Sequence, residues 1–175
     1  MDLSALLNPR SIAIVGANND TQRMGGGLVL RFLQQHGYQG RILPVNPKYE
    51  SLLGLRCYRS LADIETPVDV AVCIVPAKPL VEAIREVPAG HVKVALVLTS
   101  GFGELDAEGA RLERELLEAA RSRNITIVGP NSVGVVNLSK GVVPTISQYF
   151  DRQEIASGPL ALVSQSGAFG TALLA

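Results

Sequence analysis

The sequence predicts an α/β protein built on a doubly wound parallel sheet, and two observations carry this prediction. Short apolar, β-branched runs recur along the 175 residues with little alternation of polar and apolar positions. Strands of that kind are buried on both faces, as in a parallel sheet covered by helices. Helix-like segments separate these runs, so right-handed strand–helix–strand crossovers place helices on both faces of the sheet.

Six strands and three complete helices are expected, with a further helix beginning at the end of the chain. The strands cover residues 11–16, 41–45, 68–75, 92–99, 125–129 and 160–164, and the helices cover residues 26–37, 78–88 and 106–124. The third helix has the clearest apolar face, formed by Leu112, Leu116, Leu117 and Ala120. Asp106 is its expected N-cap, although Gly109 in the first turns argues against a strong helix start.

The rhythm of strands and helices is interrupted once. Residues 131–157 are polar, contain proline and lack periodicity, and a strand–turn–helix pattern resumes at Gly158–Pro159. We therefore expect a Rossmann-like domain at 1–130, a connecting segment at 131–157, and at 158–175 the truncated start of a second α/β domain. The final helix has neither a glycine nor a charged last turn to close it, which predicts a fragment of a longer protein.

Composition excludes several classes of function. Sixteen basic and sixteen acidic residues cancel, so no electrostatic pattern favours nucleic acid or an anionic membrane as a partner. Hydrophobic residues make up 47 % of the chain, and its mean hydropathy is +0.24, as in globular proteins. Cys57 and Cys73 lack neighbouring metal ligands, so we expect free thiols, no metal site and a cytoplasmic protein. No apolar run is long enough to span a bilayer, and the N-terminus does not resemble a secretory signal.

The loop after the first strand, "GANNDTQRMGGG", is the first candidate site. Its glycines allow close backbone approach, and the following helix start offers N–H groups to a phosphate. A strict G-x-G-x-x-G pattern is absent, because the next glycine after Gly16 is Gly25. The long loop therefore fits a larger anion better than a tight NAD turn, and the alternative is a merely flexible turn.

The loop after the second strand, "VNPKYE", carries Lys48 where a NAD-binding protein has an acid for the ribose hydroxyl. A cation there suits the 2′-phosphate of NADP or the 3′-phosphate of coenzyme A (CoA). The alternative is a solvated surface lysine, and Asn46–Pro47, which fixes the backbone before it, favours a site.

Three further loops should meet these two at the same sheet edge, because the carboxyl ends of parallel strands face one crevice. They are "VPAKP" after the third strand, "LTSGFGE" after the fourth and "VGPNSVG" after the fifth. Thr99, Ser100 and Gly101 would offer hydroxyls and an N–H to the crevice, and Asn131 and Ser132 would add polar groups. We interpret Glu104 as an acid near the next helix start, not as a site carboxylate.

Taken together, these motifs resemble the CoA-binding domain of the NDP-forming acyl-CoA synthetases, which include the succinyl-CoA synthetase α subunit and the ADP-forming acetyl-CoA synthetases. The matching segments are "NPRSIAIVGAN", "GYQGRILPVNPKYESLLGLRCYRSLADI", "VDVAVCIVPA", "TSGFGE", "GPNSVG" and "LVSQSGAFG". They cover nearly the whole chain in order. Asn18 and Asn19 depart from the "GAS" usual in that family.

The resemblance implies a set of CoA contacts. Residues lining the diphosphate would be Gly16, Ala17, Asn18, Asn19 and Gly25, and Lys48 would lie near the adenosine phosphate. Residues along the nucleotide and pantetheine would be Val75, Pro76, Leu98, Thr99 and Ser100, with Asn131 near the thiol. The phosphate-holding turn of a flavodoxin-like second domain would be Ser164, Gln165, Ser166 and Gly167, and the alternative for this turn is a simple N-cap.

The resemblance also implies the reaction of the parent protein. An acid, CoA and ATP would give acyl-CoA, ADP and phosphate through a phosphohistidine in a downstream domain, which splits one hard condensation into easier transfers. ATP and Mg²⁺ would then bind outside this chain, in downstream ligase and ATP-grasp domains or a β-type subunit. We expect no catalytic residue here, and we interpret His36 and His91 as surface residues. The fragment alone should be inactive.

Three other functions remain open from the sequence. A similar region senses acyl-CoA in some protein lysine acetyltransferases, and related Rossmann domains occur in nicotinamide-responsive DNA-binding regulators. No basic helix-turn-helix precedes the domain, which argues against the regulator. An NADP oxidoreductase is permitted by Lys48, but the chain offers no obvious acid or base for hydride transfer.

Overall fold

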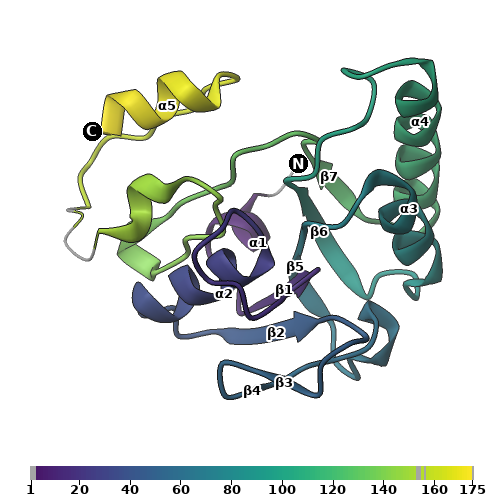
Figure 1. Cartoon of the computed structure of the whole chain (residues 1–175), viewed down its shortest axis with the longest axis horizontal. Helices are drawn as coiled ribbons and strands as arrows, with labels where there is room; N and C mark the ends of the chain where they lie inside the picture. Colours follow the sequence, from purple (N-terminus) through teal and green to yellow (C-terminus); the bar gives the residue numbers. More distant parts are fainter. Residues whose placement is uncertain (1–2, 153–154, 156, 175) are drawn as a thin grey trace.

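The computed structural model describes residues 3–152, 155 and 157–174. Its centre is a five-stranded parallel sheet in the order β2-β1-β5-β6-β7 (Figure 1). The strands are β1 Ser11–Val15, β2 Arg41–Val45, β5 Val68–Cys73, β6 Val92–Val97 and β7 Thr126–Val128. The predicted α/β class and the first five strands are confirmed, and four of these strands are one or two residues shorter than predicted because the residues at their ends belong to the loops.

Helices cover both faces of this sheet. On one face lie α1 Ser4–Leu7 and α2 Gly26–Gln35, and on the other lie α3 Ala77–Glu86 and α4 Ala107–Ser122. Adjacent strand residues alternate between the two cores, since Ile12 and Ile14 face α2 whereas Ala13 and Val15 face α3 and α4. Both faces of β1 are therefore buried, as the unbroken apolar run indicated.

The start of α4 shows why its sequence combines a good cap with a glycine. The Asp106 carboxylate accepts a hydrogen bond from the Gly109 N–H at 2.7 Å, which confirms the predicted N-cap. A Cβ at Gly109 would lie 2.0 Å from the Phe102 carbonyl oxygen, so only glycine allows this packing. The predicted apolar face is buried at Leu112, Leu116 and Ala120, whereas Leu117 is half-buried.

Several short elements have no clear sequence pattern. A two-stranded hairpin, β3 Ser51–Leu52 and β4 Leu55–Arg56, follows β2. In the described part of the chain, three 3₁₀ turns occur as η1 Leu61–Asp63, η2 Leu138–Lys140 and η3 Gln148–Asp151. None of the helices in the described part of the chain is long and apolar enough to cross a membrane.

The segment after β7 packs along the outer side of α2. Val143 and Phe150 are buried against Leu28 and Phe32 of that helix. At the end of α2, the His36 Nε2 lies 2.7 Å from the Phe150 carbonyl oxygen, and the side chain is half-buried. The expectation that His36 is an ordinary surface residue is therefore wrong. The segment that we expected to be a connector thus adds apolar packing to the outer side of α2.

The predicted strand at 160–164 is wrong, because these residues form no strand. Strand formation needs a neighbouring strand for the backbone groups, and no strand of the described residues lies against this segment. Leu160 and Val163 are accordingly 94 % and 98 % exposed. The helix expected after this run does form, as α5 Gly167–Leu174, and the division into two domains stays a prediction.

Candidate functional site

The sheet order contains one point where neighbouring strands connect to helices on opposite faces. The chain leaves β1 through α2 towards β2, whereas β5 on the other side of β1 leads to α3 on the opposite face. A crevice opens at such a point, outside the carboxyl ends of the strands. Its floor is tightly packed, because a Cβ at Gly16 would lie 2.4 Å from the Ile74 carbonyl oxygen.

The loop between Gly16 and α2 is held in shape by its own side chains. The side-chain amide oxygen of Asn18 accepts from the Asp20 N–H at 2.9 Å, and the Asp20 carboxylate accepts from the N–H groups of Gln22 and Arg23. From the next loop, the Asn46 amide donates to the Ala17 carbonyl oxygen at 2.8 Å. These hydrogen bonds give the loop a defined backbone path between β1 and α2.

Two glycines bring the start of α2 against this loop. A Cβ at Gly26 would lie 2.3 Å from the Gly16 carbonyl oxygen, and one at Gly27 would lie 2.3 Å from that of Asp20. At Gly25 a Cβ would meet nothing closer than 3.7 Å, so that glycine is not required sterically. The first turn of α2 has N–H groups without helical acceptors, which favours an anion at this position.

Lys48 lies at the carboxyl end of β2, beside the loop after β1. Its backbone N–H donates to the Asn46 side chain at 3.0 Å, which fixes the turn that carries it. Its side chain is exposed, and among the described residues its ammonium has no ion pair or hydrogen bond. A fixed backbone with an uncommitted cation suits the binding of a phosphate.

Thr99 connects three of the crevice loops. Its hydroxyl donates to the Val75 carbonyl oxygen at 2.8 Å and is 3.2 Å from that of Cys73, while its own carbonyl accepts from the Asn131 N–H at 2.9 Å. The donor of this hydroxyl is therefore used inside the protein. The neighbouring hydroxyl of Ser100 is exposed and has no hydrogen bond to any other described residue.

The remaining predicted contacts differ in how accessible they are. Pro76 and Asn131 are exposed and Val75 is half-buried, whereas Leu98 is buried, so Leu98 offers a ligand its backbone at most. Asn131 has a positive φ of 55° after the cis Gly129–Pro130 bond, a feature that the sequence analysis did not predict.

Glu104 closes the loop after β6. Its carboxylate accepts from the N–H groups of Gly101 at 2.6 Å and Phe102 at 3.2 Å, and these bonds hold the pKa of Glu104 below its ordinary value. The interpretation as a structural acid is therefore supported, although it binds its own loop and not the start of α4.

The turn at Ser164, Gln165, Ser166 and Gly167 has the geometry of a helix cap. The Ser166 hydroxyl accepts from the Phe169 N–H at 3.3 Å, and the Ser164 hydroxyl accepts from the Ser166 N–H at 3.1 Å. Both serines are exposed. The geometry is that of the N-cap alternative, and a phosphate-holding role remains a prediction.

The two cysteines and the two histidines lie outside the crevice. Burial raises the pKa of the Cys73 thiol to about 12 and also raises that of Cys57, and both thiols are free. His36 and His91 lie away from the carboxyl ends of the strands. Within the described ranges no cluster of three or more His, Cys, Asp or Glu side chains is suited to a metal ion.

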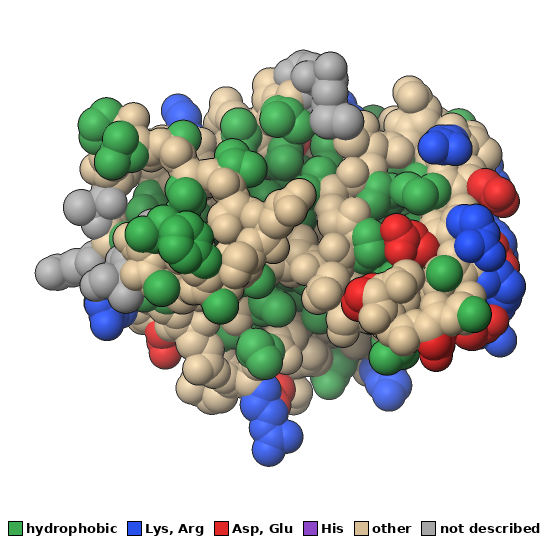
Figure 2. Space-filling model, turned by 90° about the horizontal axis from the view of Figure 1, so that it is seen from above, with side chains coloured by type: hydrophobic (Ala, Val, Ile, Leu, Met, Phe, Trp, Pro, Cys, Tyr) green, Lys and Arg blue, Asp and Glu red, His purple; other side chains and the backbone are tan. Residues whose placement is uncertain are grey.

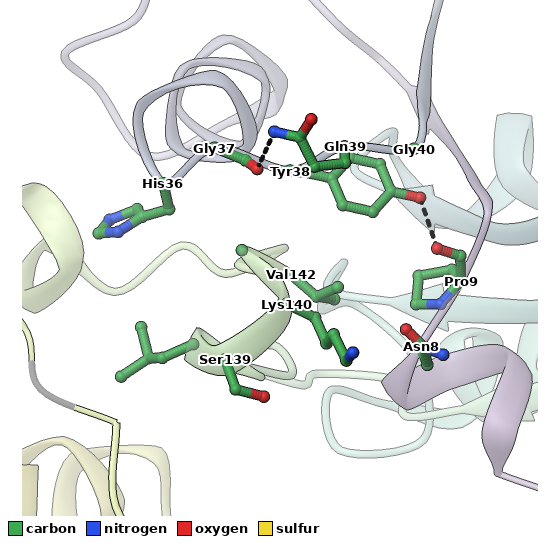
Figure 3. A pocket seen from close by; sticks show the side chains of 12 residues that line it. Asn8, Pro9, His36, Gly37, Tyr38, Gln39, Gly40, Ser139, Lys140 and Val142 are labelled. Carbon is green, nitrogen blue, oxygen red and sulfur yellow. Dashed lines mark hydrogen bonds between the residues drawn. The ribbon is translucent and has the colours of Figure 1, made fainter.

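Two surface cavities lie outside this crevice. One of about 420 Å³ is at the amino edge of the sheet, lined by residues 8–9, 36–40 and 138–142 (Figure 3). There Tyr38 donates to the Pro9 carbonyl oxygen at 2.9 Å, and Lys140 extends towards Asn8 (Figure 3). The second, of about 510 Å³, lies between α5 and the loop before α2.

Comparisons with known proteins agree with this geometry. Residues 10–137 match the family described as a CoA binding domain. The chain is 39 % identical to the alpha subunit of ADP-forming acetate–CoA ligase I of Pyrococcus furiosus, over 99 % of this chain and 37 % of that protein. It is 31 % identical to the ADP-forming 4-hydroxybutyrate–CoA ligase of Nitrosopumilus maritimus, over 98 % of this chain and 24 % of that protein.

A solved structure gives the same result. The apo form of the dinucleotide forming acetyl-coenzyme A synthetase 1 of Ca. Korarchaeum cryptofilum superposes with a TM-score of 0.88 at 38 % identity, over 99 % of this chain and 36 % of that one. The chain thus spans little more than a third of these relatives at most. It belongs to the CoA binding domain family, in the form found in ADP-forming acid–CoA ligases.

Proposed function

We propose that this chain binds CoA across the carboxyl edge of its sheet, with the diphosphate at the start of α2 and the 3′-phosphate at Lys48. The observation that carries the proposal is that a helix start packed against the loop after β1 lies beside a cation with no partner among the described residues. Gly26 and Gly27 bring the first turn of α2 against an ordered loop, and Lys48 follows the neighbouring strand with no partner among the described residues.

The other crevice loops fit the rest of the ligand. Adjacent strands are about 4.8 Å apart, so the four spacings from β2 to β7 cover roughly 19 Å. An extended CoA anchored at Lys48 would therefore pass the exposed Pro76 and Ser100 and bring its thiol end towards Asn131. The hydrogen bonds of Thr99 join the loops after β5, β6 and β7.

We further propose that the parent protein is an NDP-forming acid–CoA ligase. In that reaction a histidine outside this chain takes the terminal phosphoryl group of ATP and releases ADP. The phosphoryl group then passes to a carboxylate, and the CoA thiolate displaces phosphate from the acyl phosphate. In this scheme the chain binds and orients CoA, the 164–167 turn contributes to a phosphate site only in the complete protein, and ATP with Mg²⁺ binds elsewhere. The enzyme would work in the cytoplasm.

Calorimetric titration with CoA, 3′-dephospho-CoA and NADP tests the proposed CoA site. We expect CoA to bind more tightly than dephospho-CoA, and Lys48→Ala to weaken CoA binding by about 1–3 kcal/mol, roughly 5- to 150-fold, through the loss of a charge-assisted contact. Dephospho-CoA should bind the variant and the unaltered chain alike.

Lys140→Ala is the matched control, because it removes another exposed lysine at the amino edge of the sheet. It should leave both affinities unchanged. Equal weakening by the two substitutions would contradict a site at Lys48, and tighter binding of NADP than of CoA would contradict the proposed ligand.

A further inference from the structure

The η3 turn is attached to the outer side of α2 by polar as well as apolar contacts. Phe150 of this turn is buried against Leu28 and Phe32 of the helix. Beside this apolar contact, the Gln35 side-chain amide donates to the Asp151 carbonyl oxygen at 3.0 Å. The position of η3 on the helix is therefore fixed by hydrogen bonds, which have preferred directions, and not by apolar packing alone.

Arg31 of α2 joins this turn to the loop after β1. Its Nη1 lies 2.5 Å from the Asp151 carboxylate and 3.3 Å from the side-chain oxygen of Gln35. Its Nε donates to the Thr21 carbonyl oxygen at 3.1 Å. One guanidinium thus connects the loop that leads into α2 with a turn from the other end of the chain.

The surroundings of Arg31 favour a fixed geometry. Its side chain is 24 % exposed, whereas that of Asp151 is 53 % exposed. A partly buried ion pair is screened less by water and salt than an exposed one. The guanidinium presents its donors in a rigid planar fork, so it can bind the loop and the turn at the same time.

The Thr21 carbonyl belongs to the part of the loop that packs against the start of α2. The neighbouring Asp20 accepts hydrogen bonds from two N–H groups of the same loop. A Cβ at Gly27, in the first turn of α2, would lie 2.3 Å from the Asp20 carbonyl oxygen. A shift of Thr21 would therefore change the loop that meets the N–H groups proposed to bind the diphosphate.

We infer that Arg31 is a positioning residue for the CoA diphosphate, and that its ion pair with Asp151 couples CoA binding to the packing of η3 on α2. The inference rests on the proposed CoA site. Coupling between two sites is reciprocal, so bound CoA should in turn stabilise η3 on the helix. Since η3 precedes the segment that carries α5, the coupling connects the crevice with that later part of the chain.

Calorimetric titration of the chain with CoA and 3′-dephospho-CoA tests the role of Arg31. Arg31→Met keeps an apolar stem and removes the donors to Thr21 and Asp151. We expect it to weaken both ligands about tenfold, within the range of coupling between separate sites. The two factors should be equal, because both ligands contain the diphosphate, whereas Lys48→Ala should affect CoA alone.

Asp151→Asn tests the coupling without removing the hydrogen bond to Thr21. Asp151 is more than half exposed, so this variant should fold. We expect it to weaken CoA binding about fivefold, and to have no further effect in the Arg31→Met background, because Asp151 acts through Arg31. In hydrogen–deuterium exchange, CoA should slow the exchange of residues 148–151 in the unaltered chain and not in Arg31→Met.

Glu115→Gln is the matched control. It removes the acceptor of another ion pair between separate elements, in which Arg85 of α3 lies 2.8 Å from Glu115 of α4. Figure 2 shows charged side chains of both signs gathered on the α4 side. This variant should leave CoA affinity within about twofold.

Four results would overturn the inference. They are CoA affinity within twofold of the unaltered chain in either Arg31→Met or Asp151→Asn, additive effects of these two substitutions, an equal effect of the Glu115→Gln control, and exchange at residues 148–151 that CoA does not change. Failure of the unaltered chain to bind CoA would instead overturn the proposed function.

Discussion

Gly26→Ala tests whether the start of α2 is held against the loop after β1 as tightly as the structure shows. In an open helix this change is stabilising by about 0.5–1 kcal/mol, because alanine is the better helix former. At Gly26 the new Cβ would lie 2.3 Å from the Gly16 carbonyl oxygen and 2.7 Å from the Ala17 Cα. Both are backbone atoms, so no side-chain rotation relieves the overlap.

Overpacking of this kind costs typically about 1–3 kcal/mol, so we expect a net loss of about 1–2 kcal/mol in the free energy of unfolding. For a domain of this size that corresponds to a fall in Tm of roughly 2–8 °C, measured by calorimetry. CoA binding should weaken about tenfold or more, because the loop that receives the diphosphate must move.

Gly170→Ala in α5 is the control for helix propensity, since its Cβ would meet nothing closer than 3.7 Å. It should leave the Tm unchanged or raise it slightly. If Gly26→Ala also leaves Tm and CoA affinity unchanged, the close approach of loop and helix is refuted, and with it the physical reason for the glycines in this motif.

Two further predictions concern groups outside the crevice. Cys73 and Cys57 should not react with a thiol reagent at pH 8 in the folded chain and should both react in denaturant, because burial raises the pKa of each thiol; rapid labelling of either in the native state would contradict this burial. For Asp69, burial alone would raise the pKa, but hydrogen bonds from Lys93 at 2.6 Å and the Arg10 N–H at 2.7 Å lower it overall. Its contribution to stability is therefore present above the unfolded pKa of about 4 and lost as the pH falls through the lower folded pKa. Lys93→Met should reduce the loss of unfolding free energy between pH 5 and about 2, measured by denaturant titration at each pH. An unchanged dependence of the unfolding free energy on pH would contradict the pairing of Asp69 with Lys93.

Much of the fold was predictable because its signals are local. Short apolar runs identified five strands, of which β1 is buried on both faces, and Asp106 identified the start of α4. Gly109 argued against a strong helix start in the sequence. In the structure a glycine is needed there because a Cβ would overlap the Phe102 carbonyl oxygen, a contact that no sequence pattern shows. The strand at 160–164 failed for a related reason, since an apolar run becomes a strand only beside another strand.

The candidate site was predictable at the level of loops but not of individual groups. Parallel topology alone brings Gly16, Lys48 and Asn131 to one edge of the sheet. The Thr99 hydroxyl donates to the Val75 carbonyl oxygen and not to a ligand. No sequence pattern predicts this hydrogen bond, because it depends on the distance between the loops after neighbouring strands. The cavity beside α5 was missed entirely, because it forms between Met24 and Ala172, which lie at opposite ends of the chain.

A crystal structure of the chain with CoA would test the central claim most directly. The account predicts the diphosphate at the first turn of α2, the 3′-phosphate within hydrogen-bond distance of the Lys48 ammonium, and the sulfur on the side of Asn131. Density for the adenosine end away from β2, with Lys48 extended into solvent, would contradict it.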